Sequence, residues 1–315
     1  MIAELISPLD SARAVALLRE GEVVALPTET VYGLAADATR VDAVVKIFEA
    51  KQRPLFDPLI VHLPTRDWLA RVAEKPGSLA SSMIEKFWPG PLTIVLPRTS
   101  LIPDIVTSGL PTVAVRMSVH PVFRSIIEEF AKPLAAPSAN RFGRISPTTA
   151  HHVMSELAAR IPLIVDGGPT ELGVESTIVS VSGETITILR SGPITLEQLS
   201  DFGEVVFREA GETPDAPGRM KTHYAPQTRL AFSPIPAAPS QGLLGWEYDE
   251  DRAGEFARVE WLSKTGDLRE AAATLFSKLR SLDESGLDLI VADPVPEHGL
   301  GIAIMDRLRK AAANG

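Results

Sequence analysis

The chain has 315 residues, of which 45% are hydrophobic and 23% are charged, a balance typical of a globular protein large enough for two domains. Because it contains no cysteine, it can form neither a disulfide framework nor a thiolate zinc site, and it has no cysteine nucleophile. The net charge of −9 argues against broad binding to nucleic acid or acidic membranes but allows a local basic pocket. No apolar run reaches the roughly 20 residues of a membrane span, and the N-terminus does not resemble a signal peptide, so we expect a cytoplasmic protein.

Short β-branched runs alternate with helical patterns through the first two thirds of the chain. Strands are predicted at residues 23–26, 59–62, 92–96, 112–116, 134–136, 163–166, 177–181 and 185–190. Helices are predicted at residues 41–50, 78–87, 121–130 and 148–158, the last one capped by Thr148. The last two strands follow each other closely and predict an antiparallel hairpin, so we expect an α/β fold with a mixed, twisted sheet.

A second α/β pattern follows a segment without apolar periodicity. Residues 209–229 are rich in proline, glycine and polar side chains and are predicted to be a linker between a first domain, 1–208, and a second, 230–315. In the second domain we expect strands at 230–233, 242–246 and 287–292, and helices at 266–282 and 301–313.

Several familiar catalytic motifs are missing. The chain has no GxxxxGK[ST] or GxGxxG phosphate-binding loop, no HExxH zinc motif and no GxSxG nucleophile elbow. The adjacent His151 and His152 point to different faces of a predicted helix, which makes them poor joint metal ligands. We therefore predict no metal site built from protein side chains.

Polar stretches instead mark the ends of predicted strands. They are residues 27–38 (PTETVYGLAADA), 51–62 (KQRPLFDPLIVH), 112–116 (TVAVR), 136–149 (APSANRFGRISPTT), 166–179 (DGGPTELGVESTIV) and 188–193 (ILRSGP). Each stretch alone also fits an ordinary loop or helix cap. Together they predict a single pocket, because ligands of open α/β sheets bind beyond strand ends, and the arginines and hydroxyls suit a phosphate or a carboxylate.

These stretches, together with FWPGPLT at residues 87–93, resemble the YrdC-type catalytic domain over about residues 8–208. The linker APGRMKTHYAP and the second domain resemble the long form of the threonylcarbamoyl-AMP synthase family. The resemblance implies a twisted α/β sheet with a concave cleft, followed by a smaller Rossmann-like α/β domain. It also implies a nucleotidyltransferase that converts L-threonine, bicarbonate and ATP, with Mg2+, into L-threonylcarbamoyladenylate and pyrophosphate for the t6A modification of tRNA at adenosine 37.

The resemblance also implies roles for individual residues. The threonine site would comprise Thr30, His62, Arg116, Ala136 through its backbone, and Ser176. The ATP site would comprise Arg53, Asp57, Thr112, Ser138, Ser146, Arg190 and Tyr224. Lys51, Arg53 and His62 are the expected catalytic residues, and Tyr32 and Asn140 are further candidates for the cleft. Asp57 stands where relatives commonly have asparagine, and its carboxylate would suit the magnesium ion or the ribose better than a phosphate.

Some alternatives stay open at this point. Tyr224 either belongs to a linker that closes over the cleft as a lid, as the resemblance implies, or packs the two domains together. A nucleic-acid-binding module, a carbamoyl transferase and a regulatory protein with a relict cleft are the competing functions. The expected partners are proteins that transfer the unstable adenylate onward in t6A synthesis; a tRNA contact has weaker support, and no membrane contact is expected.

Overall fold

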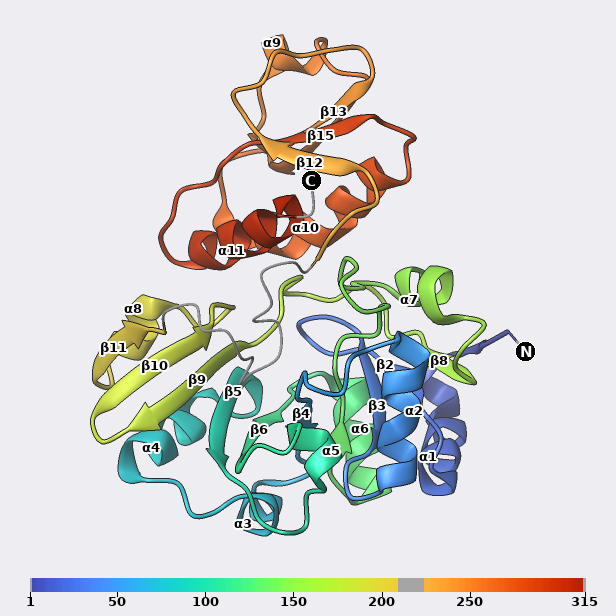
Figure 1. Cartoon of the computed structure of the whole chain (residues 1–315), viewed down its shortest axis with the longest axis vertical. Coiled ribbons are helices and arrows are strands. Elements are labelled where there is room, and N and C mark those ends of the chain that lie inside the picture. The colour runs from blue at the N-terminus through green and yellow to red at the C-terminus, as the bar shows by residue number, and fades with distance from the viewer. Residues whose placement is uncertain (1, 209–223, 314–315) are drawn as a thin grey trace.

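The computed structural model describes residues 2–208 and 224–313, and Figure 1 shows these as two α/β units. The first unit is built on an eleven-stranded mixed sheet and the second on a four-stranded parallel sheet, which confirms the predicted fold class. Most of the predicted linker and lid, residues 209–223, lies outside the described residues. Tyr224 is the first described residue after it.

The order of strands in the large sheet brings distant segments together. From one edge to the other the strands are β1 (Glu4–Ile6), β8 (Leu163–Val165), β2 (Val24–Leu26), β3 (Gly33–Asp37), β7 (Leu134–Ala135), β4 (Ile60–His62), β6 (Thr112–Met117), β5 (Gly90–Pro97), β9 (Thr177–Ser182), β10 (Thr185–Arg190) and β11 (Glu204–Phe207). The predicted β9–β10 hairpin is antiparallel, as expected. At the centre β4 and β6 run parallel with His62 opposite Arg116, so their side chains lie next to each other on one face.

Amphipathic helices cover this sheet. The longer ones are α1 (Ser11–Glu20), α2 (Val41–Lys51), α4 (Ser78–Phe87), α6 (Pro121–Phe130) and α7 (Ala150–Leu157), and the shorter ones are α3 (Leu69–Val72), α5 (Asp104–Thr107) and α8 (Leu196–Ser200), with 3-10 turns at Pro8–Asp10 and Arg66–Trp68. In α6 the side chains of Phe123, Ile126, Ile127 and Phe130 are buried at the spacing of one helical face.

Two local predictions need correction. Thr149, and not Thr148, caps α7: its hydroxyl accepts a hydrogen bond from the His152 amide at 3.2 Å. The stretch at residues 27–38, in which no strand was predicted beyond Leu26, contains the strand β3, whose sequence GLAAD has low β-propensity. Pairing with β2 and β7 on either side satisfies its backbone and stabilises it as a strand.

The second unit has strands β12 (Arg229–Phe232), β15 (Leu289–Ala292), β13 (Gln241–Glu247) and β14 (Arg258–Ser263) in that order, with helices α9 (Glu250–Ala253), α10 (Leu268–Asp283) and α11 (Leu300–Ala312). The edge strand β14, with the sequence RVEWLS, was not predicted, although its first four residues alternate between polar and apolar side chains. None of the helices in the described ranges is long and apolar enough to cross a membrane.

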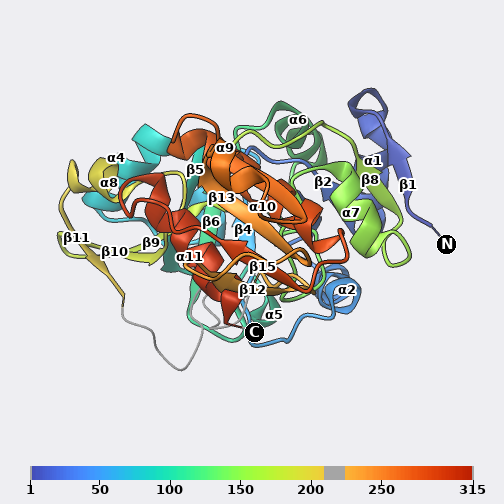
Figure 2. The same ribbon diagram turned by 90° about the horizontal axis from the view of Figure 1, so that it is seen from above.

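Helices α10 and α11 lie between the small sheet and the first unit, and from above the second unit covers the middle of the first (Figures 1 and 2). Val31, Ile145 and Val174 of the first unit share one buried apolar cluster with these two helices. The contact is close: Gly173 has φ +68°, and a Cβ atom there would lie 2.3 Å from the carbonyl oxygen of Ala272. The two units therefore pack against each other through a continuous core.

Candidate functional site

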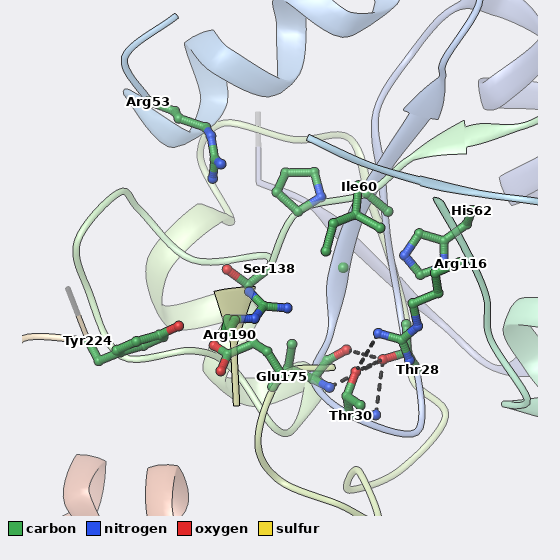
Figure 3. Close-up of a pocket in the computed structure, with 14 residues that line it drawn as sticks. Thr28, Thr30, Arg53, Ile60, His62, Arg116, Ser138, Glu175, Arg190 and Tyr224 are labelled. Carbon is green, nitrogen blue, oxygen red and sulfur yellow. Dashed lines mark hydrogen bonds between the residues drawn. The ribbon is translucent and has the colours of Figure 1, made fainter. Parts of the chain in front are cut away.

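A polar cavity lies over the centre of the large sheet, next to the second unit. Figure 3 draws the fourteen residues that line it: Thr28, Thr30, Val31, Gly33, Arg53, Ile60, His62, Arg116, Ala136, Pro137, Ser138, Glu175, Arg190 and Tyr224. They come from β3 and the segment before it, from β4, β6 and β10, from the loops after α2 and β7, and from the segments before β9 and β12, so the predicted polar stretches do converge on one pocket. His62, Arg116, Thr28 and Thr30 gather at one end, and Arg53, Ser138, Arg190 and Tyr224 lie towards the other.

At the first end, Arg116 is held by the segment before β3. Its guanidinium donates to the Thr30 hydroxyl at 3.1 Å and to the Glu29 carboxylate at 2.5 Å, and all three side chains are buried. Ser118 donates to the other oxygen of Glu29. Thr28 fixes the turn, since its hydroxyl donates to the Val31 carbonyl at 2.6 Å. Arg116 is thus presented as a fixed cation at the cavity wall.

His62 is buried beside Arg116, with its ring 4.7 Å from that of Phe123. Burial lowers the pKa of His62 well below its usual value of 6.5, and the neighbouring Arg116 lowers it further. Its Nδ1 atom has no hydrogen-bond partner among the described residues. The imidazole is therefore neutral at pH 7 and has one nitrogen available to a ligand.

This state of His62 predicts a pH dependence. Its pKa is lower in the folded chain than in the unfolded chain, so below about pH 6.5 the unfolded chain binds the extra proton. We expect the His62 ring signals in NMR spectra to show no titration between pH 6 and 8. We also expect the free energy of unfolding to fall as the pH drops below 6.5, by less in His62→Gln than in the wild type. A His62 titration midpoint near 6.5 would contradict the buried, neutral assignment.

At the second end, two buried arginines face the cavity from different elements. The Arg53 guanidinium donates to the carbonyls of Asp57 and Pro58 at 3.1 and 2.9 Å, and it forms an ion pair with the Asp57 carboxylate at 2.8 Å. Arg190 donates to the carbonyl and the hydroxyl of Ser176, both at 3.0 Å. Burial lowers the pKa of both arginines, yet both stay charged at neutral pH because the ordinary pKa of a guanidinium group lies far above 7.

Lys51 does not line this cavity. Its ammonium group donates to the carbonyls of Ser138 and Asn140, both at 2.5 Å, and its own carbonyl accepts from the Phe142 amide. The Asn140 side chain also serves the loop, donating to the carbonyls of Arg141 and Arg144. Lys51 and Asn140 therefore shape the loop that carries Ser138 and do not form the cavity wall.

Glu175 connects the cavity with the second unit. One of its oxygens accepts from the Ser146 hydroxyl at 2.5 Å, and the other accepts from Arg307 of α11 at 2.9 Å. Although burial alone would raise the pKa of Glu175, Arg307, Arg190 and the Ser146 bond lower it to about 2. Tyr224 lies nearby, stacked on Phe276 of α10 with ring centroids 5.5 Å apart.

The predicted site residues fall into two groups. Those that line the cavity are Thr30, Arg53, His62, Arg116, Ala136, Ser138, Arg190 and Tyr224. Those that do not line it are Tyr32, Lys51, Asp57, Thr112, Asn140, Ser146 and Ser176. Some of the second group support the first, since Ser176 holds Arg190 and Asp57 pairs with Arg53. The Tyr32 hydroxyl instead donates to the carbonyl of Gly168, which does not line the cavity. Thr112 starts β6 on the same strand face as Arg116, further along the sheet.

Sequence reasoning missed the two buried carboxylates of the site, Glu29 and Glu175. Both lie inside recognised stretches, PTET and GVEST, where a hydroxyl residue directly follows the carboxylate. That pattern was the available signal, since a buried acid in an arginine-rich pocket needs a cationic partner. Among the described residues, no group of three or more His, Asp or Glu side chains could hold a metal ion.

Comparisons with known proteins identify the family of the chain. The Sua5–YciO–YrdC family model, described as telomere recombination, matches residues 16–192, and the model described as the C-terminal domain of threonylcarbamoyl-AMP synthase matches residues 194–313. A threonylcarbamoyl-AMP synthase of Bacillus subtilis is 43% identical over 96% of this chain and 92% of its own length. The one from Schizosaccharomyces pombe is 37% identical over 92% and 85%.

Among solved structures, the Pyrococcus abyssi protein Sua5 complexed with L-threonine superposes with a TM-score of 0.90 at 38% identity, covering 99% of this chain and 98% of that one. The likeness thus extends over both units and the order in which they are joined. The chain belongs to the Sua5 family of threonylcarbamoyl-AMP synthases, with a YrdC-like unit followed by a Sua5-type C-terminal unit.

Proposed function

We propose that this chain joins L-threonine, bicarbonate and ATP into L-threonylcarbamoyladenylate, with release of pyrophosphate, in the cavity over the large sheet. The observation that carries the proposal is the division of that one cavity into two cationic ends. Arg116 marks one end, and Arg53 and Arg190 mark the other (Figure 3). Such a division suits one substrate with a single carboxylate and another with several phosphates.

L-threonine would occupy the end at Arg116. The guanidinium is positioned to take the amino-acid carboxylate, while Thr30, the Ala136 backbone and the free nitrogen of His62 offer further polar contacts. Ser176, which the resemblance assigns to threonine, does not line the cavity; it would act on the nucleotide end by orienting Arg190, and its hydroxyl also shares a hydrogen bond with Thr93 at 2.8 Å. The threonine complex of the Pyrococcus relative supports this assignment of the substrate.

MgATP would occupy the rest of the cavity. Arg53, Arg190 and Ser138 are placed to bind phosphate oxygens, and Tyr224 forms part of the wall beside them. An apolar patch of Ile60, Ala114, Ile178 and Leu189 on the sheet gives the nucleotide a floor that runs towards Thr112. Because no cluster of acidic residues is found in the described ranges, Mg2+ would arrive bound to the triphosphate as part of the substrate.

In the proposed reaction bicarbonate loses hydroxide to give CO2, the neutral amine of threonine attacks the CO2 carbon, and the nitrogen loses one proton, so that the net products are a carbamate and one water molecule. A carbamate oxygen then attacks the α-phosphorus of ATP, the bond to the β-phosphate oxygen breaks, and pyrophosphate leaves. Arg53 and Arg190 would stabilise the charge that develops on the leaving group, and no side chain becomes covalently attached. The neutral His62 would hold the amine and the carbamate in place and is too weak a base to remain protonated at pH 7.

Product formation tests this proposal. With labelled bicarbonate, we expect a threonine-containing adenylate and one pyrophosphate per ATP consumed, only when threonine, bicarbonate, ATP and Mg2+ are all present. Omission of threonine or bicarbonate should stop pyrophosphate release, because the attacking carbamate cannot form. ATP turnover without threonine, or a carbamoylated product that contains no nucleotide, would overturn the proposal and favour a carbamoyl transferase. Binding of RNA without any turnover would favour a nucleic-acid-binding module.

The same proposal assigns the catalytic site to residues 1–208 and a supporting role to residues 230–315.

A mixed anhydride of a carbamate and AMP hydrolyses readily, so the product needs prompt transfer. The consumers would be the proteins that build t6A on tRNA. At the cavity, buried arginines are paired with buried acids, as in Arg53–Asp57 and Arg116–Glu29.

A further inference from the structure

Arg307 of α11 is among the most deeply buried charged residues of the described chain, with 1% of its surface exposed. Its Nε atom donates to Glu175 at 2.9 Å, one Nη atom donates to the Ser191 carbonyl at 2.9 Å, and the other donates to Asp306 at 2.6 Å. Its guanidinium carbon also lies 5.2 Å from the centre of the Tyr224 ring. Arg307 therefore contacts three separate segments outside its own helix.

Two of these contacts are residues of the cavity wall. Glu175 and Tyr224 both line the cavity, and Ser191 directly follows Arg190, which also lines it. Glu175 in turn fixes Ser146. One side chain of the second unit is thus linked to one continuous part of the wall, at the end that we assign to ATP, while the Arg116 end has its own partners, Glu29 and Thr30.

We propose that Arg307 is a positioning residue for the nucleotide, through which the second unit fixes Glu175, Tyr224 and the Arg190 segment around ATP. The proposal rests on the ATP site described under Proposed function. Arg307 acts through its neighbours and does not itself line the cavity. It gives the second unit a part in substrate binding beyond its packing on the first.

Electrostatics explains why an arginine is needed at this position. Arg307 and Arg190 both lower the pKa of the Glu175 carboxylate, and Arg307 lowers it more. Without Arg307, the uncompensated Glu175 would draw Arg190 towards itself and away from the phosphates of ATP. An apolar residue at position 307 would still allow the units to pack, because the interface already contains a continuous apolar cluster. Cohesion of the two units therefore does not by itself require the buried guanidinium.

Arg280 of α10 provides a matched control. It is also a nearly buried arginine that joins the two units, donating to the Ile145 carbonyl at 2.8 Å and to Glu156 at 3.0 Å. Neither Arg280 nor its two partners line the cavity. Replacing Arg280 removes an interdomain contact of similar kind and leaves the wall contacts of Arg307 in place.

The experiment measures ATP affinity by calorimetry, with KM for ATP and for threonine alongside, in full-length Arg307→Met, Arg307→Lys and Arg280→Met. We expect Arg307→Met to weaken ATP binding at least tenfold and to change the KM for threonine by less than twofold. Arg307→Lys should recover part of the ATP affinity. Arg280→Met should lower the melting temperature and leave both substrates unaffected. In Arg307→Met/Glu175→Gln, which removes both charges, ATP affinity should exceed that of Arg307→Met.

The proposal is overturned if Arg307→Met binds ATP normally, or if Arg307→Met and Arg280→Met weaken ATP binding equally. If Arg307→Met does not fold, Arg307→Lys and Arg307→Met/Glu175→Gln take its place. In that case the proposal is overturned if both of these variants bind ATP with the affinity of the wild type. If the wild type binds ATP but forms no adenylate, the proposed reaction fails while the calorimetric test of Arg307 stands. If the wild type binds no ATP, both proposals fail.

Discussion

Replacing Arg116 by alanine should lower kcat/KM for threonine by roughly 10- to 100-fold and leave the KM for ATP nearly unchanged. Its expected partner is the amino-acid carboxylate, and charge-assisted contacts of this kind contribute about 1.5–3 kcal/mol. Arg116→Lys should restore only part of the activity, because an ammonium group cannot reproduce the planar fork that now contacts Thr30 and Glu29. Steady-state kinetics with each substrate varied in turn measures the split.

The buried Glu29 complicates this variant and also supplies its control. Without Arg116, Glu29 keeps Ser118 as a partner but loses its compensating cation, so Arg116→Ala should also be less stable. Arg116→Ala/Glu29→Gln should recover stability without recovering the use of threonine. Ser176→Ala should weaken ATP binding to a smaller extent than Arg190→Ala, because Ser176 does not line the cavity and orients Arg190. Normal threonine saturation in Arg116→Ala would remove this arginine from the site.

Replacing Arg190 or Arg53 by alanine should weaken ATP binding by about 1.5–3 kcal/mol each, or roughly tenfold to a hundredfold, without unfolding the protein. Both guanidinium groups line the cavity and are oriented by backbone carbonyls, so their direction is set before the nucleotide arrives. Pre-oriented cations lose little conformational entropy when they bind phosphates, so replacing one of them by alanine removes a large part of the binding free energy. Calorimetric titration with ATP and Mg2+ measures the effect directly.

The variants need controls for stability and for charge. Arg53→Ala leaves the Asp57 carboxylate without its ion-pair partner, so Arg53→Ala/Asp57→Asn separates the loss of a phosphate contact from a buried unpaired acid. Arg309→Ala is the control for charge. It also removes one positive charge, but from α11, where Arg309 forms an exposed ion pair with Glu297, and this variant should bind ATP normally. Unchanged ATP affinity in both Arg53→Ala and Arg190→Ala would exclude these arginines from the nucleotide site.

The α/β class, most of the strands and longer helices, and the stretches that form the cavity could be predicted from the sequence alone. These features depend on local periodicity and on residues that are close in the chain, as in the β9–β10 hairpin and the apolar face of α6. The sequence did not predict β3, because the small residues of that strand have little β-propensity and depend on pairing with β2 and β7.

The pairing of the charged groups depends on the tertiary structure. Arg116 pairs with Glu29 across 87 positions of the chain, and Arg307 pairs with Glu175 across 132, so no local pattern could predict either pair. Lys51 and Arg53 are two residues apart and read as one cationic cluster in the sequence. In the fold Lys51 ends α2 and turns to the carbonyls of a loop, while Arg53 comes after the helix and lines the cavity. The direction of a buried cation depends on which carbonyls and carboxylates the fold brings within hydrogen-bonding distance, because an uncompensated buried charge is too costly to keep.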